Sequence, residues 1–146
     1  MYTSPPKNHG LSLLGVDFLD EAISEADRAR RVPPPESDLA RRQAAEKIWG
    51  YVASELNREL RAAGLQVEPG SGGHDDRRRW LRELDRALGR NLTARHDAYA
   101  DLHGACFYDS RCPPPEVLKA LAREAREFVE EAKQALLEVR RRGARA

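Results

Sequence analysis

Arg90 and His96, with Asn91 directly after the arginine, are the sharpest candidates for chemistry in this sequence. A neutral histidine can take the proton from a 2′-hydroxyl of RNA, while an arginine stabilises the charge on the attacked phosphate. Asn91 would orient the two side chains. Such a site would cleave RNA without a metal ion and would leave a 2′,3′-cyclic phosphate.

The same residues also allow a structural interpretation. Residues six apart in a helix differ by about 600° of rotation, so their side chains would point about 120° apart. Gly89 would relieve this conflict if it broke the helix and left Arg90 outside the next one. In the structural interpretation these residues serve as helix caps and surface ion pairs.

A second set of residues has the spacing of a ligand-binding helix face. Arg95, Tyr99 and His103 recur every four residues, and Tyr108 follows shortly after. With His96 nearby, this face could bind a phosphate or a nucleotide. Alternatively, His103 and Tyr108 connect the helix end to the following loop through hydrogen bonds.

Other polar and aromatic residues have weaker signals. Glu46 and Lys47 stand beside apolar helix positions, where they could face a pocket as a buried pair or act as partly buried structural groups. The run 77–79 places three arginines at an expected helix start, where their charge opposes the helix dipole and favours a phosphate. A solvated surface is the alternative. Trp49 and Trp80 are expected in the core or at a dimer interface.

Several kinds of site are not supported. No Walker loop, dinucleotide-binding fingerprint, HExxH motif or serine nucleophile elbow occurs, and the glycine-rich stretch 70–73 follows no strand. We expect Cys106 and Cys112 to be free thiols in a reducing cytosol, with a disulfide across their short loop as the alternative. No CxxC or HxxxH pairing accompanies them, so we expect no metal and no cofactor.

The composition is typical of one globular domain. Of 146 residues, 34% are charged and 40% hydrophobic, and the net charge of +1 means that RNA would need a local basic patch. No apolar run approaches the roughly 18 residues of a membrane span, and residues 1–10 lack the apolar core of a signal peptide. We therefore expect a cytoplasmic protein without membrane contact. Its many arginines are typical of thermophile proteins and equally of GC-rich genomes.

Apolar spacing and helix breakers predict five helices and no strand. The expected ranges are 11–31, 36–63, 75–88, 91–106 and 115–142, separated by proline- or glycine-containing breaks. Since the connections are short, we expect an antiparallel helical bundle over 11–142. Residues 1–10 are expected to be disordered or loosely packed, and 143–146 to form a tail.

Two stretches resemble one family. Residues 38–50, DLARRQAAEKIWG, are similar to the QA-EK-W stretch of the archaeal PaREP-type proteins, which we place among the HEPN-like bundles. Residues 102–109, LHGACFYD, followed by Pro114 and Val117, resemble that family's LH-x-x-FYE signature and its proline-led last helix. Residues 18–22 are similar to its first helix. Cys106 stands where the family has asparagine, and Asp109 where it has glutamate.

This resemblance implies an HEPN-like fold and a toxin–antitoxin or defence-type system. The Arg-x5-His pattern of Arg90 and His96 matches that of HEPN ribonucleases, whose site residues often meet across a dimer interface. A nucleotidyltransferase-type protein is the implied protein partner.

Two hypotheses on function follow. In the first, the chain is a non-catalytic module that holds a nucleotide, RNA or a protein partner. In the second, it is a metal-independent endoribonuclease, and Arg90 and His96 should then lie together in an open cleft of one chain or of a dimer. The apolar residues of the last helix recur with a seven-residue period, and Trp49, Tyr51 and Trp80 exceed what one small core easily buries. These two observations predict a homodimer.

Overall fold

The computed structural model of this protein describes residues 9–70 and 72–145, with side chains for 18–70 and 72–143. Within these ranges the chain forms five helices and no strand. They are α1 (His9–Ala29), α2 (Glu36–Ala62), α3 (Gly72–Leu88), α4 (Leu92–Tyr108) and α5 (Pro115–Arg145). The predicted all-α bundle is thus confirmed, whereas most of the N-terminal segment expected to be loose lies outside the described residues.

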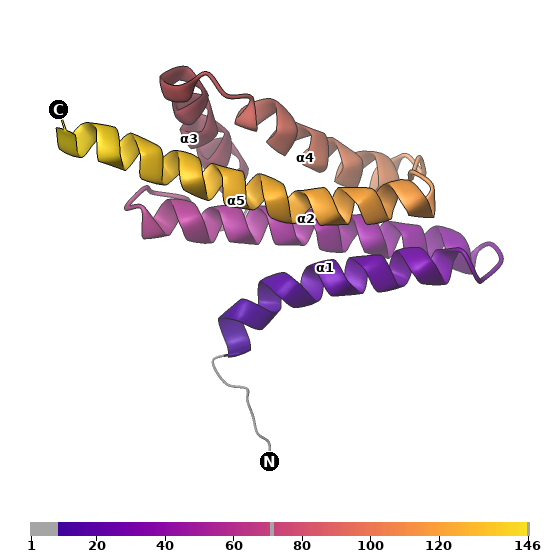
Figure 1. Cartoon of the computed structure of the whole chain (residues 1–146). Coiled ribbons are helices and arrows are strands. Elements are labelled where there is room, and N and C mark those ends of the chain that lie inside the picture. Colours follow the sequence, from indigo (N-terminus) through magenta and orange to yellow (C-terminus); the bar gives the residue numbers. More distant parts are fainter. Residues whose placement is uncertain (1–8, 71, 146) are drawn as a thin grey trace, which may run out of the picture.

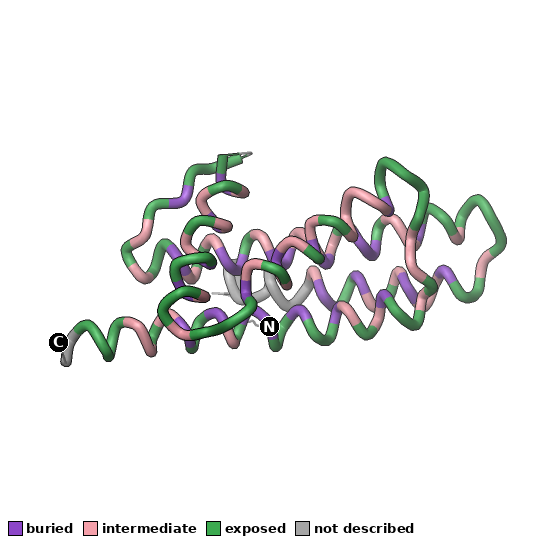
Figure 2. Tube along the Cα trace, turned by 90° about the horizontal axis from the view of Figure 1, so that it is seen from above, coloured by how far each residue is buried: buried purple, intermediate pink, exposed green. Residues whose placement is uncertain are grey.

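The central helices of the bundle are α2 and α5, each of which contacts all four of the other helices. The helix α2 runs antiparallel to α1, and α5 lies along α2, while α3 and α4 lie on the side of the bundle away from α1 (Figure 1). Figure 2 shows buried positions recurring along the long helices and exposed residues at the connections between them. This alternation is the one that the apolar spacing predicted.

Small side chains bring α1 and α2 together. Buried alanines recur every three or four residues on both helices: Ala22, Ala26, Ala29, Ala40 and Ala44. Because alanine has no atoms beyond Cβ, the two backbones can approach closely. Larger side chains from all five helices fill the rest of the core, including Leu19, Ile48, Leu56, Leu81, Leu92, Leu118 and Phe128.

The helix ends lie within two residues of the predicted ones, except at the start of α3 and the end of α5. Gly64 adopts a φ of 87°, and the amide of Leu65 donates to the carbonyl of Leu60 at 3.0 Å, which closes α2 in a Schellman motif. The helix α5 continues to Arg145, through the start of the expected tail. Arg141 and Arg142 both pair with Glu138 one turn earlier, and such pairs stabilise a helix.

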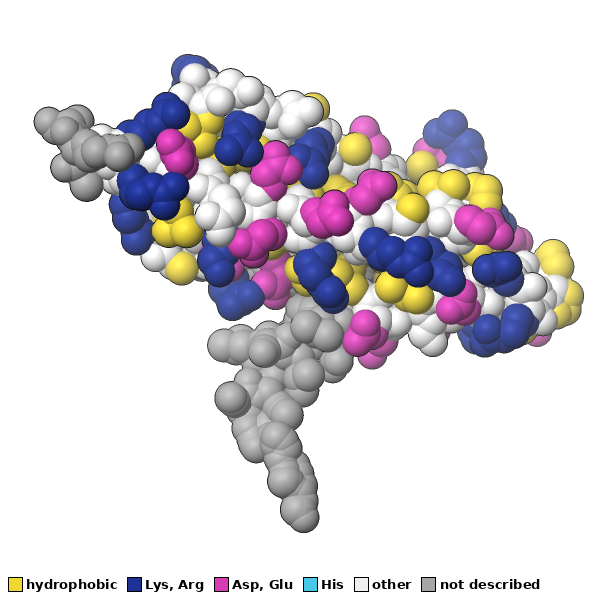
Figure 3. Space-filling view, in the orientation of Figure 1, with side chains coloured by type: hydrophobic (Ala, Val, Ile, Leu, Met, Phe, Trp, Pro, Cys, Tyr) yellow, Lys and Arg dark blue, Asp and Glu magenta, His cyan; other side chains and the backbone are white. Residues whose placement is uncertain are grey.

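The surface carries both signs of charge. Lys and Arg side chains are interspersed with Asp and Glu over the face drawn in Figure 3, with no extended area of one sign. None of the described helices is long and apolar enough to cross a membrane.

Candidate functional site

Arg90 and Asn91 lie in the link between α3 and α4. Arg90 donates from Nη1 to Glu131 of α5 at 3.2 Å, and Asn91 occupies the N-cap position without a side-chain capping bond. The cap comes from α3 instead. The carboxylate of Asp85 accepts from the amides of Leu92 at 2.7 Å and Thr93 at 3.0 Å. These two bonds satisfy amides that the first turn of α4 would otherwise leave without partners.

His96 is completely buried between α2, α3 and α4, with an exposed fraction of 0%. Arg77 of α3 donates from Nε to His96 Nε2 at 3.2 Å, and Trp49 of α2 packs edge-on against the imidazole at 5.3 Å. His74 lies 5.2 Å away, measured between ring centroids. The contacts of His96 are thus with α2 and α3, whereas Arg90 binds α5.

The partners of His96 fix its tautomer. A guanidinium can only donate, so Nε2 must be unprotonated, and Nδ1 must then carry the proton that is shared with Asp97 Oδ1 at 3.1 Å. Asp97 in turn accepts two parallel bonds from Arg78, at 2.9 and 3.0 Å. The imidazole is held neutral, and its pKa falls to about 4, mainly because burial penalises the charged form.

Arg77 reaches the interior because of a glycine one turn earlier. A Cβ on Gly73 would lie 2.6 Å from the carbonyl oxygen of Glu68 and 3.2 Å from Arg77 Nη1. The guanidinium also donates to Asn57 at 3.0 Å and lies 5.4 Å from the centre of the Trp49 ring. Burial lowers the pKa of Arg77. The arginine run 77–79, considered above for phosphate binding, therefore does not form one surface. Arg77 and Arg78 instead bond to residues of α4.

Arg95 and Tyr99 line a cavity of about 380 Å³ between α4 and α5. Arg95 donates to Glu131 at 2.6 Å and lies over the ring of Phe128, 5.0 Å from its centre. Tyr99 is buried, and its ring stacks on Phe128 at 5.7 Å. Burial raises the pKa of this tyrosine to about 12. Both side chains therefore contribute to the contact of α4 with α5.

His103, Glu46 and Tyr108 come together at the opposite end of α4. His103 Nε2 lies 3.5 Å from the carboxylate of Glu46 on α2, and its ring is 6.5 Å from that of Tyr108. Phe107 stacks on His103 with ring centres 5.6 Å apart. Lys47 does not join them, because it pairs with Glu21 of α1 at 2.8 Å.

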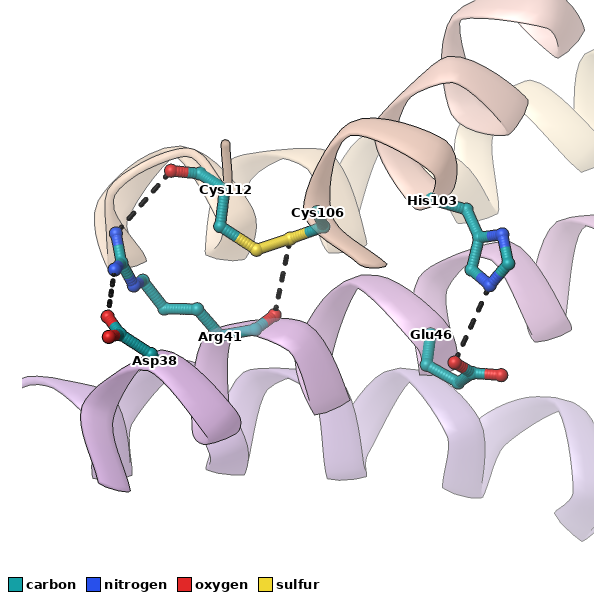
Figure 4. The surroundings of a disulfide bond; sticks show 6 residues. All are labelled: Asp38, Arg41, Glu46, His103, Cys106 and Cys112. Atoms are coloured by element: carbon teal, nitrogen blue, oxygen red, sulfur yellow. Dashed lines mark hydrogen bonds and ion pairs between the residues drawn. A yellow bond between two sulfur atoms is a disulfide. The ribbon is translucent and has the colours of Figure 1, made fainter. Parts of the chain in front are cut away.

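We expected the two cysteines to be free thiols, with a disulfide as the alternative. The alternative is correct, because they form a disulfide. Cys106 lies in the last turn of α4, and the turn after it brings Cys112 back to the helix end, with the amide of Arg111 donating to the carbonyl of Ala105 at 2.9 Å. Figure 4 shows the disulfide above Arg41, whose guanidinium donates to the carbonyl of Cys112 at 3.4 Å and to Asp38 at 2.6 Å.

A cavity of about 320 Å³ opens beside this disulfide, between the start of α2 and the α4–α5 connection. Its lining includes Leu39, Arg42 and Ser110 as well as both cysteines. Arg42 Nε is buried without a hydrogen-bond partner, and its guanidinium lies 5.8 Å from the centre of the Phe107 ring. Ser110 has a φ of 56°, a conformation that residues with a side chain rarely adopt.

No protein family, curated protein or solved structure matches this chain. The geometry of its own side chains must therefore indicate what the chain binds. Arg41, Arg42 and the disulfide line this cavity. The exposed ring of Phe107 lies beside Arg42, and the exposed ring of Tyr108 packs against Phe107. We call Arg41, Arg42, Phe107, Tyr108 and Ser110 the arginine–aromatic site. Within the described residues, no group of acidic, histidine or cysteine side chains is arranged to hold a metal ion.

Sequence reasoning missed Arg42 and Phe107 as site residues. Both lie inside the two stretches that carry the family resemblance, which is the signal that could have pointed to them. Nothing in the sequence spacing indicates that Arg42 and Phe107 meet, because they are 65 positions apart. The contact arises from the antiparallel packing of the two helices.

Proposed function

We propose that this chain is an HEPN-like helical-bundle module that binds a nucleotide at the arginine–aromatic site. The observation that carries the proposal is Arg42, whose buried Nε has no hydrogen-bond partner beside a cavity of ligand size. In the described part of the chain no carboxylate pairs with this guanidinium. Arg41, by contrast, already pairs with Asp38 at 2.6 Å.

The site has groups for both parts of a nucleotide. A guanidinium donates two parallel hydrogen bonds to phosphate oxygens, and these charge-assisted bonds would satisfy the donor that Arg42 leaves unpaired. Phe107 is 46% exposed and Tyr108 76% exposed, and they meet edge to face at 5.1 Å. Exposed aromatic rings of this kind stack on nucleobases.

Replacing Arg42 by alanine should weaken ATP binding about tenfold or more, because a charge-assisted bidentate contact contributes about 1.5–3 kcal/mol. Isothermal titration calorimetry with ATP, ADP and adenosine measures the effect, and adenosine should bind more weakly than ATP. Phe107→Ala should weaken all three ligands.

The matched control for this prediction is Arg86→Ala. Arg86 is an exposed arginine whose partner is Glu83, one turn away on the same helix. Equal losses in Arg42→Ala and Arg86→Ala would indicate a general charge effect. If wild-type protein releases no heat with any of the three ligands and shows no thermal shift with them, nucleotide binding is refuted.

The alternative function, metal-independent cleavage of RNA by Arg90 and His96, receives less support from these contacts. A general base must reach the 2′-hydroxyl, and His96 is completely buried with both ring nitrogens occupied. We therefore propose binding rather than catalysis for the single chain.

We also propose that the chain forms a homodimer through the far end of the bundle. A cavity of about 540 Å³ between α3 and the C-terminal part of α5 is lined by apolar side chains, among them Trp80, Leu84, Leu136 and Val139. Exposed Leu137 lies in an adjoining hollow with Lys133 and Arg140. Apolar grooves of this kind favour a partner surface.

Charge also favours a second copy as the occupant. Lys133 and Arg140 of α5 form no ion pair within the described residues, although Glu59 and Glu83 line the same two cavities. A two-fold axis would bring the cations of each chain to the carboxylates of the other, because such an interface applies one surface patch to itself.

The double variant Leu137→Glu, Arg140→Glu should convert a wild-type dimer into a monomer, since it places two carboxylates in an apolar interface. Sedimentation velocity over a concentration series measures the change. Arg123→Glu, an exposed residue of α5 outside both cavities, should remain dimeric. A wild-type monomer at the highest concentration would contradict the proposal.

A further inference from the structure

One wall of the arginine–aromatic site is closed by the Cys106–Cys112 disulfide. Cys106 and Cys112 both line the cavity, and the bond between them holds the α4–α5 connection against the end of α4. Ser110, another lining residue, lies inside the loop that this bond closes and adopts the left-handed backbone conformation. The position of this wall therefore depends on the disulfide.

We propose that the Cys106–Cys112 disulfide is a redox modification site that sets the nucleotide affinity of the cavity, with the oxidised protein as the tight-binding form. This inference rests on the nucleotide-binding function proposed above. It follows from three observations: both cysteines line the cavity, Cys112 is only partly buried, and the structure already holds an acceptor for the thiol that reduction would form.

The two cysteine residues differ in exposure. Cys106 is 1% exposed, whereas Cys112 is only partly buried. A dithiol reductant therefore attacks Cys112 Sγ as a thiolate, the bond between the two cysteines breaks, and Cys106 leaves and takes up a proton. The second thiol of the reductant then displaces Cys112 as a thiol and closes the reductant's own disulfide. Two electrons and two protons pass to the protein.

The reduced state has a hydrogen-bond partner prepared for it. Cys106 Sγ lies 3.8 Å from the carbonyl oxygen of Arg41, as the dashed line in Figure 4 shows. A sulfur in a disulfide has no proton to donate, so this contact becomes a hydrogen bond only when Cys106 is a thiol. Cys106 can thus remain in place after reduction, while Cys112 is released from the helix end.

Release of Cys112 disturbs the cation side of the site as well. The carbonyl of Cys112 accepts from Arg41 Nη1 at 3.4 Å, so movement of the loop removes one of the two contacts that hold this guanidinium. The wall containing Ser110 then has to be ordered at the moment of binding. Ordering groups on binding reduces affinity, whereas a rigid wall avoids that cost.

The test compares oxidised protein, protein reduced with dithiothreitol, and the double variant Cys106→Ser, Cys112→Ser. Calorimetric titration with ATP should give about tenfold weaker binding for the reduced protein than for the oxidised protein. The double variant should match the reduced protein and should not respond to dithiothreitol. Without ligand, hydrogen exchange at the amides of residues 109–112 should be faster in the reduced protein and in the double variant.

The outcomes separate this inference from the proposed function. If both redox forms bind ATP equally, the redox inference is wrong and nucleotide binding stands. If neither form binds ATP, nucleotide binding is wrong and so is its redox control; the exchange rates then decide whether the disulfide orders the loop. Two free thiols in protein purified without reductant, measured by thiol titration, would also overturn the inference.

Discussion

The free energy of unfolding should decrease by about 3 kcal/mol when the pH is lowered from 7 to 4, because folding keeps His96 neutral. Its pKa is lowered from 6.5 to about 4 in the folded protein. Between these two values the unfolded chain binds a proton that the folded chain does not, so acid favours unfolding. Above pH 6.5 and below pH 4 this histidine contributes no further change. Urea titrations at a series of pH values measure the slope.

His96→Gln should remove this pH dependence, since glutamine stays neutral over the whole range. The variant should be less stable than wild type at pH 7, and the difference should shrink as the pH approaches 4. His103→Gln is the matched control, because His103 is only partly buried and pairs with Glu46 near the surface. If the wild-type slope persists in His96→Gln, another group causes the acid sensitivity.

Arg77→Ala should destabilise the fold by about 3 kcal/mol or more, the range observed when one member of a buried polar network is removed. The substitution leaves Asn57 and His96 Nε2 without their donor and removes the cation that lies 5.4 Å from the centre of the Trp49 ring. Chemical denaturation of the variant at pH 7 measures the loss.

Two comparisons define the origin of that effect. Arg79→Ala, an exposed neighbour that pairs with Asp76 in its own helix, should change stability by less than about 0.5 kcal/mol. In a double-mutant cycle, Arg77→Ala combined with His96→Gln should cost clearly less than the sum of the single changes, since the two residues share one hydrogen bond. Strict additivity would show that the network does not act as a unit.

The helices could be predicted because their signals are local. Leu56 and Leu60 recur at the helical period, and Gly64 ends α2 as the pattern indicates. The start of α3 was less predictable. The expected start was residue 75, whereas the helix begins at Gly72, although glycine is a poor helix former. Gly73 is favoured there because the carbonyl of Glu68 leaves no room for a Cβ.

The candidate site could be predicted only in part, because burial is a property of the packed molecule. The sequence singled out His96 and the arginine run at 77–79, yet it gave no indication that one of these arginines donates to that histidine in the interior. The disulfide depends in the same way on the turn at the end of α4, which brings Cys112 back to Cys106. His103 was expected on a possible ligand-binding face and Glu46 beside Lys47, and the packing of α4 on α2 brings His103 and Glu46 together.

The two hydrogen bonds that the Asp85 carboxylate accepts at the start of α4 limit how this protein can change during evolution. One carboxylate of α3 serves two amides seven and eight positions later, so the chain between them has a fixed number of residues. The side chains of the intervening residues can vary. An inserted or deleted residue there would separate the carboxylate from both amides and would rotate α4, and with it His96, relative to α3. Length variation among descendants of this chain should therefore avoid this corner.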